Sequence, residues 1–222
     1  MFRIKICGVT TVEDARIAAD AGADAIGLNF FDKSPRFVSE RVAERIAAAL
    51  PVGVKKIGVF VNATASEIRD RYVAASLDLI QLHGDEPPEF LSELDGLPVM
   101  RAFRPTGALT SVRDYLSECD RVSLRPAMIL IDAFSKDQYG GTGETADWAA
   151  IKAARPFLGK APLVLAGGLN PSNVACAIAA VEPDAVDTAS GVEISPGRKS
   201  AKLIQAFVAE AQGAFDLVNK SR

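Results

Sequence analysis

The chain is 222 residues long, 49% of them apolar, and carries a formal net charge of −3 at pH 7. This length suits one large α/β domain or two small ones, and the mildly acidic balance disfavours electrostatic binding to nucleic acid or to an anionic membrane. Since no apolar run approaches the roughly 18 residues that cross a bilayer, we expect no membrane span and no nucleic-acid partner.

The cysteines and the N-terminus indicate the cellular compartment. Cys7, Cys119 and Cys176 are odd in number and lack the spacing of disulfide or metal-binding pairs. An expected strand begins within two residues of the N-terminus, which leaves no room for the basic segment of a signal peptide. We therefore expect a cytoplasmic protein with free thiols.

Short apolar runs alternate with helix-period segments along the chain. The runs are near-continuous, which is typical of strands in a parallel sheet covered by helices. Helix start signals lie between them at Thr11, Ser39, Thr64 with Glu67, and Asn170-Pro171. Eight strands are expected, at Arg3–Cys7, Ala25–Asn29, Lys56–Val61, Leu79–His83, Val99–Arg104, Met128–Asp132, Leu163–Ala166 and Ala185–Thr188.

Eight βα units in a chain of this length predict an α/β fold of the (β/α)8 TIM-barrel type. No linker or composition shift divides the chain, so we expect residues 1–222 to form one catalytic domain. A doubly wound sheet is the alternative, but its first strand is usually followed by a G-x-G-x-x-G turn. The segment Cys7-Gly8-Val9-Thr10 does not supply that turn.

Reactive side chains end three of the expected strands, where a barrel builds its active site. They are Cys7, His83 and Asp132. Lys5 lies two residues before Cys7 on the same face, and we expect its charge to lower the pKa of the thiol. His83 is the only histidine, and a lone imidazole is more often structural. We expect no metal site, because no cluster of ligands accompanies it.

Asp132 follows four apolar residues, and burial disfavours the charged form of a carboxylate, which suits a general acid. The segment 133–143 after it contains Gly140, Gly141 and Gly143 and is interpreted as a lid that closes over a ligand.

Two glycine-containing loops follow the last two strands, where this fold often binds phosphate. They hold Gly167-Gly168 and Ser190-Gly191. After the second strand, Ser34-Pro35-Arg36 could aim a guanidinium at the barrel mouth to bind a carboxylate.

The motifs together resemble the phosphoribosylanthranilate isomerase family of tryptophan biosynthesis, nearly from end to end. The segments that carry the resemblance are Lys5-Ile6-Cys7-Gly8, Gly27-Leu28-Asn29-Phe30, Ser34-Pro35-Arg36, Val59-Phe60-Val61-Asn62, Gln81-Leu82-His83-Gly84-Asp85-Glu86, Asp132 with Gly140-Gly141-Thr142-Gly143, Ala166-Gly167-Gly168-Leu169 and Asp187-Thr188-Ala189-Ser190-Gly191-Val192-Glu193.

The resemblance implies an Amadori rearrangement of N-(5-phosphoribosyl)anthranilate to 1-(2-carboxyphenylamino)-1-deoxyribulose 5-phosphate. It assigns the general base to Cys7, the general acid to Asp132 and the anthranilate carboxylate to Arg36. It places the phosphate at Gly167, Gly168, Ser190 and Gly191, with His83 and Asp187 lining the pocket. One acid and one base suffice for this chemistry, so we expect no cofactor and no obligate protein partner.

Two alternatives remain at this stage. A related barrel isomerase of histidine biosynthesis acts on a phosphoribosyl aminoaldose, but it uses two aspartates where this chain has Cys7 and Asp132. The other alternative is a barrel that binds a phosphoribosyl ligand without turnover.

Overall fold

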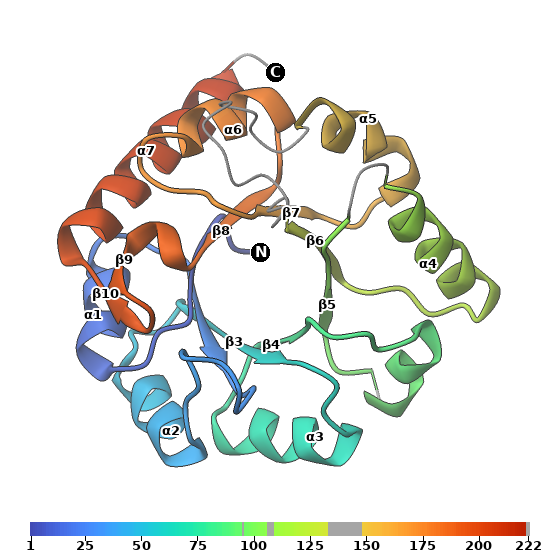
Figure 1. Cartoon of the computed structure of the whole chain (residues 1–222), viewed down its shortest axis with the longest axis horizontal. Coiled ribbons are helices and arrows are strands. Elements are labelled where there is room, and N and C mark those ends of the chain that lie inside the picture. The colour runs from blue at the N-terminus through green and yellow to red at the C-terminus, as the bar shows by residue number, and fades with distance from the viewer. Residues whose placement is uncertain (95, 106–108, 133–147, 221–222) are drawn as a thin grey trace.

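The computed structural model describes residues 1–94, 96–105, 109–132 and 148–220, which form a closed barrel of eight parallel strands in sequence order. Figure 1 shows the strands as an inner ring with the helices around it. The predicted fold is confirmed. The strands are β1 (Ile4–Cys7), β2 (Ala25–Asn29), β3 (Lys55–Phe60), β4 (Leu79–Leu82), β5 (Val99–Phe103), β6 (Met128–Asp132), β7 (Leu163–Ala166) and β8 (Ala185–Thr188).

The outer ring is made of seven α-helices and one 3₁₀ helix among the described residues. No described helix is both long and apolar enough to cross a membrane. The 3₁₀ helix η1 (Pro88–Leu94) stands where a full helix was expected. The α-helices are α1 (Val12–Asp20), α2 (Glu40–Ala49), α3 (Ala65–Ala74), α4 (Thr110–Arg121), α5 (Trp148–Leu158), α6 (Val174–Val181) and α7 (Ala201–Lys220).

The helix start signals act as the sequence predicts at two positions. The Thr11 side chain accepts a hydrogen bond from the Asp14 N–H, and Thr64 with Glu67 forms a complete capping box. Asn170 does not cap a helix. It accepts from the Ser172 N–H within a turn, and α6 begins four residues after Asn170, at Val174.

Alternation along each strand separates two apolar layers. One set of side chains faces the helices and forms the larger core. The other set points into the barrel and plugs it, with Phe2, Ile57, Met100 and Leu130 among its members. Above this plug, toward the strand C-termini, several inward positions are polar. Lys5, Gln81 and Asp187 are buried there, so the floor of the barrel mouth is a polar layer resting on a sealed apolar one.

A buried ion pair anchors the loop after β4. The Glu86 carboxylate lies 3.1 Å from Arg101 Nη1, and the side chains are 3% and 7% exposed. Glu86 also accepts from the backbone N–H groups of Asn62 and Gly84, while Arg101 donates to the Leu82 and Gly84 carbonyls. The loop that follows His83 is thereby fastened to β3 and β5.

Replacement of Glu86 by alanine should lower the free energy of unfolding by about 3–5 kcal/mol, because it leaves the buried Arg101 guanidinium unpaired. Glu86→Gln should lose less, since its amide oxygen can still accept. The exposed Glu89→Ala variant should change stability by less than about 0.5 kcal/mol. Urea unfolding followed by circular dichroism measures all three, and equal midpoints for Glu86→Ala and Glu89→Ala would contradict the anchor.

Candidate active site

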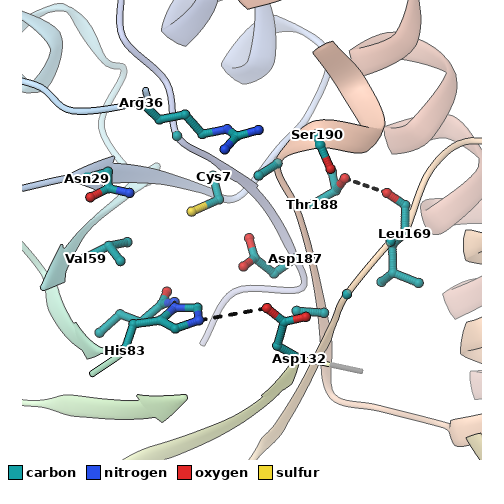
Figure 2. A pocket seen from close by; sticks show the side chains of 16 residues that line it. Cys7, Asn29, Arg36, Val59, His83, Asp132, Leu169, Asp187, Thr188 and Ser190 are labelled. Atoms are coloured by element: carbon teal, nitrogen blue, oxygen red, sulfur yellow. Dashed lines mark hydrogen bonds and ion pairs between the residues drawn. The ribbon is translucent and has the colours of Figure 1, made fainter. Parts of the chain in front are cut away.

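An open cavity of about 270 Å³ lies at the C-terminal ends of the strands. It is lined by residues from every strand of the barrel, or the loop after it, except β5. Figure 2 shows the side chains that project into it. The lining residues are Cys7, Gly8, Asn29, Arg36, Val59, Gln81, His83, Asp132, Ala166, Gly167, Gly168, Leu169, Asp187, Thr188, Ala189 and Ser190. Eight of the nine predicted site residues are therefore brought together; Gly191 lies outside the lining.

Cys7 ends β1 and is held closely against β2. Its partner in the ladder is Gly27, where an added Cβ would lie 2.7 Å from the Cys7 Sγ and 3.1 Å from the Lys5 Cε. Only glycine leaves room there for both inward side chains of β1. Cys7 and Asp132 reach the cavity from opposite sides, with Asp187 between them in the view of Figure 2.

A buried ion pair lies beneath the thiol. Lys5 on β1 and Asp187 on β8 are register partners, and Lys5 Nζ lies 3.0 Å from the Asp187 carboxylate. Burial alone would lower the pKa of Lys5, but the Asp187 carboxylate and the Cys7 side chain raise it above its ordinary value. Lys5 therefore remains a cation inside the barrel.

Lys5 lowers the pKa of the Cys7 thiol as expected, but the expected net lowering of that pKa is wrong. Burial raises the pKa of the Cys7 thiol, and the Asp187 carboxylate raises it further, while Lys5 opposes both with its charge and a hydrogen bond. The net pKa lies above the ordinary value because burial, together with the Asp187 carboxylate, outweighs the effect of Lys5. The thiol is mainly protonated at neutral pH.

The side chains of His83 and Asp132 point toward each other (Figure 2), with His83 Nε2 and Asp132 Oδ2 3.9 Å apart. On its other side, His83 Nδ1 lies 2.7 Å from the Gln81 amide nitrogen. Burial, followed by the positive charges of Arg104, Lys5 and Arg101, lowers the pKa of His83 to about 3. The imidazole is therefore neutral at physiological pH.

Arg36 reaches the cavity mouth from the loop after β2 and is held by a carboxylate. Its Nε and Nη2 donate to the two Glu193 oxygens at 2.8 and 2.6 Å. These contacts occupy one edge of the guanidinium and leave its outer Nη1/Nη2 edge for a second, bidentate carboxylate. The hydrogen bond to Glu193, above all, raises the pKa of Arg36.

Lys199 completes this ion network. It comes from the hairpin of β9 (Glu193–Ser195) and β10 (Arg198–Lys199) that follows η2 (Ser190–Val192). Its ammonium donates to Glu193 at 2.8 Å and to the carbonyls of Cys7 and Ala189 at 2.6 and 3.0 Å. One buried cation thus joins the tip of β1, the loop after β8 and the partner of Arg36.

The loops after β7 and β8 offer backbone rather than charged side chains. Gly167 and Gly168 have φ of 94° and 65°, values that favour glycine. The Gly168 carbonyl accepts from Asn170 and Asn173, which fixes this turn. Gly191 packs behind the cavity wall, where an added Cβ would lie 1.9 Å from the Leu169 carbonyl oxygen.

Sequence reasoning did not single out Gln81, Glu193 or Lys199. Gln81 lies inside a strand rather than at its tip, and its signal is a polar residue between apolar neighbours. Glu193 and Lys199 belong to a short hairpin without strong strand propensity, and their partners lie far away in the chain. The predicted lid at 133–143 lies outside the described residues. Within the described ranges, no cluster of three or more His, Cys, Asp or Glu could hold a metal ion.

A family model described as N-(5'phosphoribosyl)anthranilate (PRA) isomerase matches residues 4–210. The chain belongs to this family. Relatives named N-(5'-phosphoribosyl)anthranilate isomerase include proteins of Geobacter sulfurreducens, 45% identical over 96% of this chain and 100% of that protein, and Pseudomonas syringae pv. tomato, 45% identical over 95% and 98%.

Solved structures of the same family match the barrel closely. Phosphoribosyl anthranilate isomerase from Thermotoga maritima has a TM-score of 0.82 and 40% identity, over 96% of this chain and 100% of that chain. A second structure, with a TM-score of 0.80 and 38% identity over the same shares, is described as a complex with reduced 1-(o-carboxyphenylamino)-1-deoxyribulose 5-phosphate. This PRA isomerase family member therefore shares both sequence and fold with a ligand-bound relative.

The raised pKa of Cys7 should appear in its reactivity. Alkylation by iodoacetamide should accelerate with a midpoint above about pH 8.5, the ordinary value for a cysteine, because only the thiolate reacts. Mass spectrometry of the Cys7 peptide measures the rate at each pH. A Cys7 midpoint below about pH 8.5 would contradict the assignment.

Proposed function

We propose that this chain catalyses the Amadori rearrangement of N-(5'-phosphoribosyl)anthranilate to 1-(2-carboxyphenylamino)-1-deoxyribulose 5-phosphate in tryptophan biosynthesis. The observation that carries the proposal is the pairing of a thiol and a carboxyl group, Cys7 and Asp132, on opposite sides of one cavity in a member of this family. The reaction is an aldose–ketose isomerisation, which makes the enzyme an intramolecular oxidoreductase.

Asp132 is the proposed general acid. Its protonated carboxyl delivers a proton to the ribose ring oxygen as the bond from that oxygen to C1' breaks. The anilino nitrogen supplies the electron pair for a C1'=N bond, so the product of this step is a protonated Schiff base and the Asp132 carboxylate. Its position at the strand end suits this role, because the ring oxygen must lie within hydrogen-bond reach of the acid.

Cys7 is the proposed general base. Its thiolate removes the proton from C2', the C–H electron pair forms a C1'=C2' bond, and the Schiff base nitrogen becomes neutral. The resulting enolamine then tautomerises to the ketone, with C1' gaining a proton and the C2' hydroxyl losing one. Lys5 beneath the thiol stabilises the thiolate that this step requires.

The two ends of the substrate are held by different parts of the mouth. We assign the anthranilate carboxylate to the outer edge of Arg36 and the phosphate to the loops at Gly167, Gly168, Ser190 and Gly191. His83 and Asp187 line the same cavity. The partner is thus a small phosphorylated molecule.

We further propose a cytoplasmic enzyme in which residues 1–222 form one catalytic domain. Three free cysteines support a reducing compartment.

Cys7→Ala and Asp132→Ala should each lower kcat by roughly 100-fold or more, the scale for loss of one acid or base. The loss of phosphoribosylanthranilate fluorescence measures turnover, and circular dichroism checks that both variants fold. Near-normal turnover in either variant would contradict the acid or base role assigned to that residue. A wild-type protein that binds the ligand without turnover would instead favour a phosphoribosyl-binding barrel.

Arg36→Ala should raise KM by about 10- to 150-fold, since a charge-assisted hydrogen bond is worth about 1.5–3 kcal/mol. This holds if substrate dissociates faster than it reacts. Arg36→Lys should recover only part of the loss, because an ammonium cannot bind both Glu193 and a substrate carboxylate in a bidentate manner. An unchanged KM in Arg36→Ala would show that Arg36 does not contact the substrate.

A further inference from the structure

Gln81 is a fully buried polar side chain in the cavity lining to which the proposed reaction gives no role. It precedes His83 by two positions at the end of β4, so both side chains point into the barrel. The Gln81 amide nitrogen lies 2.7 Å from His83 Nδ1. Its amide oxygen is buried without a hydrogen-bond partner among the described residues.

The neutral state of His83 makes the position of its single ring proton a structural variable. A neutral imidazole carries one N–H, at Nδ1 or at Nε2, and the other nitrogen is an acceptor. The positive charges around the ring come from Arg104, Lys5 and Arg101, and Asp132 faces it from β6. The neighbours of the two nitrogens decide between the tautomers.

The two neighbours select the same tautomer. If Gln81 turned its oxygen toward the ring, its buried NH2 group would lose its acceptor, and orphaned donors are rarer in proteins than orphaned carbonyl oxygens. The amide therefore donates to Nδ1. Asp132 Oδ2, 3.9 Å from Nε2, favours a proton on that nitrogen, since a lone pair there would face the oxygen.

We propose that Gln81 is a positioning residue that holds neutral His83 in the Nε2–H tautomer and directs this donor at Asp132 and the reacting centre. The catalytic consequence rests on the proposed function. After Asp132 has given its proton to the ring oxygen, an N–H donor stabilises the carboxylate that remains. A neutral imidazole does so without competing as an acid or base.

The single histidine allows a direct test. In untagged protein with ¹⁵N-labelled histidine, every imidazole signal comes from His83. A long-range ¹H–¹⁵N spectrum should show a protonated Nε2 and an unprotonated Nδ1. This pattern should not change between about pH 5 and pH 8, because the whole range lies above the His83 pKa of about 3. A protonated Nδ1, an average of both tautomers, or titration in this range would overturn the proposal.

Two substitutions of Gln81 test the cause. Gln81→Met removes the donor with little change of volume and should give signals averaged between the tautomers. Gln81→Glu replaces the donor with an acceptor and should move the proton to Nδ1. The exposed Gln205→Met variant on α7 is the matched control and should keep the wild-type spectrum. An Nε2–H spectrum in folded Gln81→Met would show that Gln81 does not set the tautomer.

Kinetics separate this proposal from the proposed function. Gln81→Met should lower kcat by about 10-fold or more with a smaller change in KM, because the donor acts on charge that develops during reaction. Gln205→Met should match the wild type. Failure of wild-type turnover would overturn the proposed function but leave the tautomer result intact. An unchanged kcat in a Gln81→Met variant with altered tautomers would overturn the catalytic role of the donor.

Discussion

The buried charge of Lys5 is the constraint around which the polar layer of the barrel is arranged. An unpaired ammonium inside a barrel would cost several kcal/mol, so a carboxylate must come from a neighbouring strand. The register between β1 and β8 supplies Asp187 beside it. Cys7 then lies one inward position above Lys5, and Gly27 leaves space for both. Strand register thus fixes the distance between the proposed base and the nearest positive charge.

A second buried cation connects the chemistry to substrate recognition. Lys199 binds the carbonyls of Cys7 and Ala189 and one oxygen of Glu193. Although burial pushes the pKa of Glu193 upward, hydrogen bonds from Arg36 and Lys199 hold it below its ordinary value. The guanidinium that is proposed to hold the substrate carboxylate is therefore positioned by the same network that holds the tip of β1, so its distance from the thiol is fixed.

The sequence predicts the barrel well because most of its strands are near-continuous apolar runs. It predicts the strand tips because the reactive residues Cys7 and Asp132 end two such runs. It does not predict pairings across the chain. Arg36 and Glu193 are 157 residues apart, and nothing local links them. The predicted direction of the Cys7 pKa shift was wrong for a related reason. The balance between burial and the shared charge of Lys5 depends on packing, which the sequence does not show.

A raised thiol pKa has an advantage for the proposed reaction. The basicity of a thiolate rises with its pKa, and removal of a carbon-bound proton requires a strong base. The thiolate is then scarce at neutral pH, and Lys5 limits that scarcity by opposing the effect of burial. Because His83 is neutral, it adds no positive charge that would lower the pKa of the thiol. The site therefore keeps a strong base at low population, while the protonated thiol is protected from oxidation and alkylation, which require the thiolate.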